Sequence, residues 1–425
     1  MTAFIFTFSL LGAMALGLPV AISLLVSAIA LMVTQGQIDT TILSQKLIEG
    51  ADSFPLLAIP FFILAGELMN SGGLSRRIVN FALAWVGHIR GGLGLVAIFA
   101  TVVMSAISGS AAADTAAVAT LLIPMMRSAG YNVARSSGLI AASGVLGPVI
   151  PPSIGMIVFG VIANVSIGKL LLAGVFPGLM IAVALVIAWL WVVRKDKVEA
   201  LPRQPMAQRV RAGIDGAWAL VMPLGIIGGL KFGIFTPTEA GVAACVYAFL
   251  IGAFVYRELA WSALYRLFVQ AAKTTAVVVF MIAAALVSAF LITTSEVPQQ
   301  VAAMLEPFIG HPKLLMFVIM VLIVVIGTAL DFAPTLMILT PVLMPVIKQA
   351  GIDPVYFGVL FIINNSIGLI TPPVGIVLNV VCGISKISMG ELMKGLWPFF
   401  WAEIIVLFLL VLFPSLVLVP LKWLT

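Results

Sequence analysis

Residues Ser105 to Ile154 read SAISGSAAADTAAVATLLIPMMRSAGYNVARSSGLIAASGVLGPVIPPSI, and a related stretch occurs a second time in the chain. The second copy runs from Gly327 to Gly375 and reads GTALDFAPTLMILTPVLMPVIKQAGIDPVYFGVLFIINNSIGLITPPVG. Three landmarks recur at a constant offset of 221 residues: Pro124 with Pro345, Ala129-Gly130 with Ala350-Gly351, and Pro151-Pro152 with Pro372-Pro373. Composition alone does not keep such a register, so the sequence contains an internal repeat.

Each copy interrupts its apolar residues in two places. The first interruption is a short segment of small and polar residues, Ser108 to Asp114 in one copy and Gly327 to Asp331 in the other, and a Pro-Pro pair follows about 40 residues later. Such breaks free backbone carbonyl groups, which a bilayer tolerates only where protein buries them or where they line a wet cavity. Paired interruptions in two halves of a chain predict the binding site of a secondary transporter.

Composition indicates a membrane protein. Of the 425 residues, 62% are hydrophobic and 9% are charged, and the mean hydropathy is +1.24; these values are typical of a polytopic membrane protein. The net charge of +6 indicates topology rather than nucleic-acid binding, because no basic stripe lies on a soluble domain. Cys245 and Cys382 fall in apolar runs as buried thiols, and the isolated His88 and His311 lack metal-ligand spacing.

We therefore expect an all-α polytopic membrane protein, built as an inverted repeat with two re-entrant helical hairpins and two broken helices. Each arm of the first hairpin has about 16 residues, roughly 24 Å of helix, which is less than the roughly 30 Å of bilayer hydrocarbon. The predicted units are a first repeat (1–211) with an inner hairpin (92–127) and a broken helix (136–163), a linking span (212–236), and a second repeat (237–425) with an outer hairpin (314–347) and a broken helix (355–383).

The basic residues predict the orientation. When both hairpins are treated as re-entrant and Phe4 to Val33 as one long span, sixteen lysines and arginines, among them every arginine, fall on one side. The other side has six lysines: Lys46, Lys169, Lys231, Lys313, Lys348 and Lys422. Because basic loops stay in the cytoplasm, this split predicts a cytoplasmic N-terminus, a periplasmic C-terminus and hairpins that open to opposite sides.

Six motifs resemble the large membrane subunit of tripartite ATP-independent periplasmic (TRAP) transporters, and the resemblance covers essentially the whole chain. They are PFFILAGELMNSGGLSRRIV from Pro60, SGSAAADTAAVATLLIPMM from Ser108, GPVIPPSIG from Gly147, FTPTEAG from Phe235, MILTPVLMP from Met337 and IGLITPPVG from Ile367. The resemblance implies a sodium-driven importer of the elevator type in the bacterial inner membrane. It also implies two partners, a small four-helix membrane subunit and a periplasmic binding protein that delivers an organic acid.

Other functions remain open or are excluded by the residues. A sodium/dicarboxylate symporter that works without a binding protein and a passive channel would both keep the broken helices. The acid itself is open among sugar acids, C4-dicarboxylates and sialic acid. The sequence contains no phosphate-binding loop, no H-E-x-x-H, no G-x-S-x-G and no cluster of histidine with carboxylates, so we do not expect an enzyme or an ATP-driven pump.

The repeat also pairs candidate ligands for sodium, a hard cation that prefers oxygen ligands, mostly backbone carbonyls at broken helices. Gly147, Ile150 and Pro152 at the first Pro-Pro break correspond to Gly368, Thr371 and Pro373 at the second. Each of these two sets is expected to face the tip of the hairpin that precedes it. The hydroxyls of Ser108 and Thr371 are possible side-chain ligands. The alternative is that these small residues only permit close helix packing. The candidates are Ser108, Ala112, Gly147, Ile150 and Pro152 for one site, and Gly327, Asp331, Gly368, Thr371 and Pro373 for the other.

Two acidic residues lie near the hairpin tips. A carboxylate in the bilayer centre costs about 2.5 to 3.5 kcal/mol, so Asp331 is the better candidate for the second sodium site, whereas Asp114 fits a helix cap as well as a functional role. No arginine or lysine lies at either tip, so an anionic substrate would depend on helix N-termini and their free amide groups. Polar side chains that could assist are Ser110, Ser153, Asn364 and Asn365.

Overall fold

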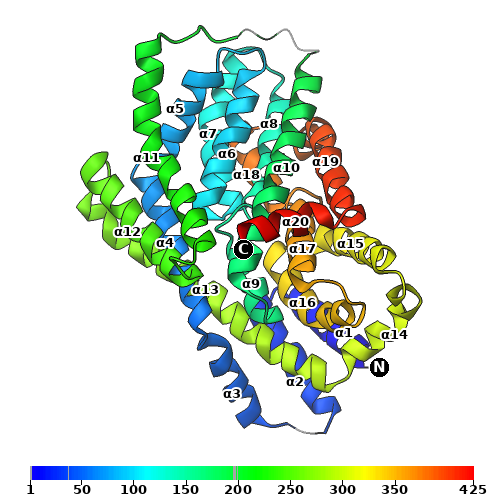
Figure 1. Cartoon of the computed structure of the whole chain (residues 1–425). Coiled ribbons are helices and arrows are strands. Elements are labelled where there is room, and N and C mark those ends of the chain that lie inside the picture. The colour runs from blue at the N-terminus through cyan, green and yellow to red at the C-terminus, as the bar shows by residue number, and fades with distance from the viewer. Residues whose placement is uncertain (1, 37, 195–197, 199) are drawn as a thin grey trace.

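Helices account for all of the regular secondary structure in a computed structural model that describes residues 2–36, 38–194, 198 and 200–425 (Figure 1). Within this described part, eight helical segments are long and apolar enough to cross a membrane. Shorter apolar helices include both arms of each broken helix. The all-α membrane fold expected from the sequence is therefore confirmed.

Two long helices, α10 and α11, follow each other near the middle of the chain. The elements up to α10 are α1 (Thr2–Ala15), α2 (Val20–Thr34), α3 (Thr40–Ala51), η1 (Phe54–Leu57), α4 (Ala58–Ser71), α5 (Leu74–Val86), α6 (Gly92–Ser108), α7 (Ala111–Ser128), α8 (Val133–Ser143), η2 (Gly144–Leu146), α9 (Ile154–Ala163) and α10 (Ile167–Val193). The remaining elements are α11 (Met206–Lys231), α12 (Pro237–Leu250), η3 (Ile251–Val255), α13 (Trp261–Thr294), α14 (Val297–Ile309), α15 (Pro312–Ala329), α16 (Phe332–Gln349), α17 (Pro354–Gly368), α18 (Ile376–Ser385), α19 (Met389–Leu412) and α20 (Ser415–Leu424).

The helices of the two copies of the predicted repeat begin and end at matching positions. At an offset of 221 residues, the bounds of α7 become those of α16, and α6 and α9 match α15 and α18 to within one residue. The N-cap residues of α7 and α16, Ser110 and Asp331, are also 221 residues apart. Both Pro-Pro bonds, Pro151-Pro152 and Pro372-Pro373, are cis. The two hairpins and the two broken helices are therefore equivalent units.

The first apolar segment, predicted as one span, is divided in two. α1 ends at Ala15, and α2 begins after Gly17, whose φ is +83°, and Pro19. Glycine tolerates that φ and proline has no N–H to donate, so the helix ends there. Thr2 donates to the Ser295 carbonyl and Gln35 donates to the Ser295 hydroxyl at 3.3 and 2.5 Å. Both ends of the α1–α2 pair therefore meet, and the prediction of a single span from Phe4 to Val33 is wrong.

Loops that were expected to share one side meet in the structure. Arg90 donates to the carbonyl of Arg194 at 3.4 Å, and Arg127, at the end of α7, donates to the carbonyl of Ser385 at 2.7 Å. At the other end, Lys46 of α3 and Lys348 of α16 line one cavity, and Figure 1 places α3 far from the open end of α6 and α7. The hairpins therefore open to opposite ends. Lys195 and Lys197, which were counted with the arginines, lie outside the described residues.

Two groups of helices pack around the site. α2, α3 and α4 pack against α13, and α4 packs against α12, while α6 to α10 pack among themselves and against α17 to α19. α13 also contacts α16 and α9, so this 34-residue helix separates the two groups (Figure 1). The hairpins and broken helices thus lie against α13 and the shorter helices packed on it.

Candidate functional site

The tip of the first hairpin is a tight turn held against the first Pro-Pro break. α6 ends at Ser108, and Gly109 has a φ of +60°. A Cβ on Gly109 would lie 2.7 Å from the Pro152 carbonyl oxygen, which explains why glycine stands there. Ser110 then caps α7, since its hydroxyl accepts a hydrogen bond from the Ala113 amide at 3.4 Å.

Asp114 is buried just behind this tip. The Ser108 hydroxyl donates to Asp114 Oδ1 at 2.6 Å and accepts from the Ser110 amide at 3.1 Å. Asp114 therefore does not cap α7, a role that Ser110 takes. Within the described part of the chain, Asp114 Oδ2, Ser105 Oγ and Thr115 Oγ1 are buried without a hydrogen-bond partner. Buried oxygens without partners call for an explanation such as a bound ion.

The first break lies directly beside this polar cluster. A Cβ on Gly147 would lie 2.7 Å from the Ala111 amide nitrogen, and one on Gly144 would lie 2.1 Å from Thr115 Oγ1. Ser153 is fully buried: it caps α9 by accepting from the Met156 amide at 3.2 Å and donates to the Pro148 carbonyl. Backbone thus packs on backbone where the hairpin tip meets the break.

The second tip repeats this arrangement with different side chains. Asp331 caps α16, with its Oδ1 accepting from the Phe332 amide at 2.7 Å. A Cβ on Gly368 would lie 3.0 Å from the Gly327 carbonyl oxygen, so the second break also touches its hairpin. The Thr371 hydroxyl donates to the Ile367 carbonyl at 2.8 Å. Pro372 and Pro373 are exposed in this chain, whereas Pro151 and Pro152 are buried.

The two asparagines of α17 hold the second hairpin in place. Asn364 donates to the Met320 carbonyl at 2.7 Å, and Asn365 donates to the Phe332 carbonyl at 2.6 Å. Both side chains are 1% exposed. Their Oδ1 atoms have no hydrogen-bond partner among the described residues. The donated bonds tie α17 to both arms of the hairpin.

One cavity of about 240 Å³ brings the two tips and the two breaks together, and we call it the inner cavity. Of the predicted site residues, Ser110, Ala112 and Asp331 line it, while Ser153, Asn364 and Asn365 do not. Its walls are Gly109–Ala112 of the first tip, Asp331–Ala333 of the second, Pro148 and Ile154 at the first break, Leu369 and Ile376 at the second, Gly155 and Val158 of α9, Leu336 and Met337 of α16, and Val278 and Met281 of α13.

The other predicted sodium ligands do not line the inner cavity, and Pro373 is exposed. Gly147, Pro152 and Gly368 meet a hairpin tip through the backbone contacts given above. The side chain of Ile150 instead packs on α10, since a Cβ on Gly178 would lie 2.7 Å from its Cγ1. Sequence reasoning missed Ser105 and Thr115. Their counterparts at the 221-residue offset are Ile326 and Leu336, so the repeat gave no signal for them.

Comparisons with known proteins agree with this architecture. Residues 7–416 match the family model of the tripartite ATP-independent periplasmic transporter, DctM component. The chain is 49% identical to the 2,3-diketo-L-gulonate TRAP transporter large permease protein YiaN of Escherichia coli (strain K12), with all of both chains covered. It is 38% identical to the sialic acid TRAP transporter large permease protein SiaM of Vibrio cholerae, covering 96% of each chain.

A solved structure is similar in fold. The Alcanivorax borkumensis YdaH transporter aligns with a TM-score of 0.65 over 87% of this chain and 86% of its own, at 15% sequence identity. The likeness therefore concerns the arrangement of helices alone. The match to the family model over nearly the whole chain is decisive, and the chain belongs to the DctM family, the large permease subunits of TRAP transporters.

Proposed function

We propose that this chain is the permease subunit of a sodium-coupled importer of a small organic anion. The observation that supports the proposal best is the inner cavity, where both hairpin tips and both breaks meet beside α13. Inverted repeats with broken helices that meet at one central site suit alternating access. A small four-helix membrane subunit and a periplasmic binding protein are the proposed partners, and the bacterial inner membrane is the proposed location.

Two sodium sites would lie between each tip and its break. In the first, backbone oxygens near Gly147 and Pro152 would act with the Ser108 hydroxyl, and the free Oδ2 of Asp114 would supply negative charge nearby. Sodium, a hard cation, suits such oxygens. In the second, the backbone at Gly327 and Gly368 would act with Thr371 and Asp331. The second site has the weaker support, because its break is exposed at Pro372 and Pro373.

The substrate would bind in the inner cavity through helix N-termini. α7, α9 and α16 all begin at its wall, at Ala111, Ile154 and Phe332. The N-terminus of a helix offers free amide groups and a partial positive charge to a carboxylate. The name of the E. coli relative makes a sugar acid, 2,3-diketo-L-gulonate, the first compound to test. C4-dicarboxylates and sialic acid come next.

For the transport step, we propose an elevator movement of the hairpins and broken helices along α13. Because basic loops stay in the cytoplasm, we place the end with Arg90 and Arg127 inside and the end with Lys46 and Lys348 outside. The N-terminus then lies outside, because Thr2 and Gln35 meet at Ser295.

The test is uptake into liposomes that contain this chain with its small subunit and binding protein. Accumulation of 2,3-diketo-L-gulonate, sialic acid or succinate only with an inward sodium gradient would support the proposal. Accumulation without sodium would contradict the coupling, and equilibration without accumulation would indicate a channel. Equal uptake without the binding protein would instead indicate a symporter that works alone.

A further inference from the structure

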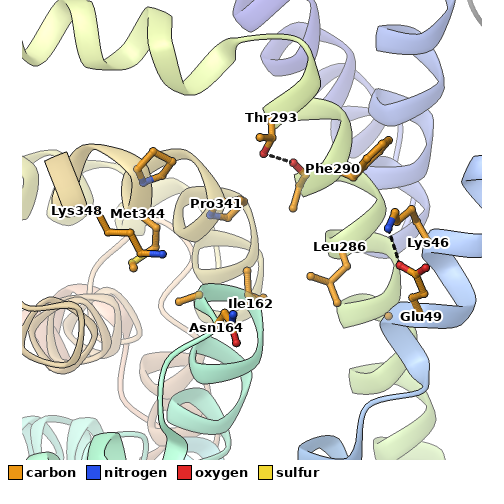
Figure 2. A pocket seen from close by; sticks show the side chains of 14 residues that line it. Lys46, Glu49, Ile162, Asn164, Leu286, Phe290, Thr293, Pro341, Met344 and Lys348 are labelled. Carbon is orange, nitrogen blue, oxygen red and sulfur yellow. Dashed lines mark hydrogen bonds and ion pairs between the residues drawn. The ribbon is translucent and has the colours of Figure 1, made fainter.

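A second, larger cavity of about 670 Å³ lies at the end of the molecule that has Lys46 and Lys348, and we call it the outer cavity (Figure 2). One wall consists of α3 and α13, with Lys46 and Phe290, and the other consists of α16 and the end of α9, with Lys348 and Asn164. Figure 2 shows the two lysines on opposite sides of the open space. None of these residues belongs to the site described above.

The outer cavity lies next to the inner cavity along three helices. α13 lines the inner cavity at Met281 and the outer cavity from Leu286, one to two turns further along. α16 lines the inner cavity at Met337 and the outer cavity at Pro341. On α9, Val158 faces the inner cavity and Ile162 the outer. Three helices thus line both cavities in succession.

The charges around the outer cavity are unequal. Lys46 forms a 2.6 Å ion pair with Glu49, and its Nζ lies 5.2 Å from the centre of the Phe290 ring. Lys348 is exposed and has no ion pair or side-chain hydrogen bond within the residues that the structure describes. The cavity therefore has one lysine that is compensated and, across from it, one that is not.

Both lysines also have simpler explanations. A lysine in the last turn of a helix stabilises the helix dipole, which fits Lys348 in α16. An exposed ion pair at i and i+3, like that of Lys46 with Glu49, contributes little. Neither explanation accounts for their facing each other across a cavity formed by both groups of helices. Electrostatic attraction into a narrow cleft raises the local concentration of an oppositely charged solute.

We infer that the outer cavity is an anion-binding site that receives a carboxylate before it enters the inner cavity. This inference rests on the proposed function, because the proposed substrate is what identifies the bound anion as a carboxylate. Lys348 attracts the carboxylate, and Lys46 joins it when the carboxylate displaces Glu49. The exposed amide of Asn164, at the same opening, is placed to donate to the bound anion. Glu49 competes for Lys46, which keeps the binding weak enough for the anion to move on.

The test uses a thiol reporter and does not depend on knowing the substrate. Cys245 and Cys382 are replaced by serine, and Thr293→Cys, an exposed residue that lines the outer cavity, is introduced in the full chain. The modification rates by sulfonatoethyl and trimethylammonioethyl methanethiosulfonate are compared. Lys348→Gln should lower the anionic-to-cationic ratio about threefold or more, because one unit charge near the thiol is removed. Glu49→Gln should raise the ratio, and Lys348→Arg should preserve it.

Two controls make the outcome decisive. Lys313→Gln removes a lysine at the same end of the molecule that does not line the outer cavity, and it should leave the ratio unchanged. The rate with neutral methyl methanethiosulfonate should be equal in all variants, which shows that folding and access are intact. An unchanged ratio in Lys348→Gln would overturn the inference. The sodium dependence of uptake is measured separately, so its failure would affect the proposed function and leave this result intact.

Discussion

The hydroxyl of Ser108 donates a 2.6 Å hydrogen bond to the buried carboxylate of Asp114, across the tip of the first hairpin. The pair joins the last residue of α6 to the first turn of α7. It also leaves one carboxylate oxygen free beside the first break. The tip therefore has a fixed shape and an unsatisfied oxygen, two properties that a cation site needs.

Ser108→Ala should weaken the response to sodium. The substitution removes a buried hydrogen bond, worth about 0.5 to 1.5 kcal/mol, and a proposed sodium ligand. We expect the sodium concentration for half-maximal uptake to rise about tenfold or more. Ser128→Ala is the matched control, because its hydroxyl is exposed at the far end of α7 and donates to the carbonyl of Met125 in its own helix. A normal sodium response in Ser108→Ala would remove this hydroxyl from the site.

Gly147→Ala and Gly368→Ala should impair transport and stability together. The new Cβ would lie 2.7 Å from the Ala111 nitrogen in one case and 3.0 Å from the Gly327 oxygen in the other. Backbone must move to accept it, at a cost of about 1 to 3 kcal/mol for overpacking. The melting temperature and the uptake rate of the purified complex should both fall.

Gly383→Ala provides the comparison for these two variants. Gly383 lies in α18, and a Cβ there would meet nothing within 4 Å. This variant should melt and transport like the parent chain. If Gly147→Ala behaved like Gly383→Ala, the close packing of the first break on its hairpin would be wrong.

Much of the site could be predicted because it is repeated. The 221-residue offset and the small polar breaks located both hairpins and both broken helices, and α7 and α16 keep that offset at both ends. The capping pair of Ser110 and Asp331 follows the same register.

Features that the two copies of the repeat do not share could not be predicted. Residues on either side of Gly17 and Pro19 are apolar, so hydropathy does not change at the turn from which α2 runs back toward Ser295. Asn364 and Asn365 are predicted substrate ligands, and the sequence does not indicate that their amide groups donate to Met320 and Phe332. Those directions depend on how α17 packs against α15 and α16, which a single sequence does not specify.

Asp331 has two roles that substitution can separate. Asp331→Asn keeps a side chain that caps a helix well, whereas Asp331→Ala loses the cap, at a cost of about 1 kcal/mol. The melting temperature should therefore fall in the alanine variant and stay near the parent value in the asparagine variant. If the carboxylate charge serves sodium, both variants should need more sodium for half-maximal uptake. A normal sodium response in both, and in Thr371→Ala, would leave Asp331 as a cap only.

Glu258 joins the start of α5 to the connection between η3 and α13. It accepts from Arg76 at 2.7 Å and lies 2.9 Å from Arg77, whose guanidinium is 3.7 Å from the Tyr256 ring centre. Burial opposes ionisation of Glu258, but hydrogen bonding to Arg77 and the charges of both arginines outweigh it, so its pKa is lowered from the ordinary 4.5. The ion pairs therefore hold α5 through a carboxylate that stays charged.

The stability that Glu258 contributes should depend on pH. Because its folded pKa is below its unfolded value, the contribution is fully present above about pH 4.5 and is lost as the pH falls through the folded pKa. Glu258→Gln should lower the melting temperature at pH 7 by an amount that shrinks toward pH 4. Glu306→Gln changes an exposed carboxylate of α14 and should have no effect at either pH. An equal loss at both pH values would show that Glu258 acts through packing rather than through charge.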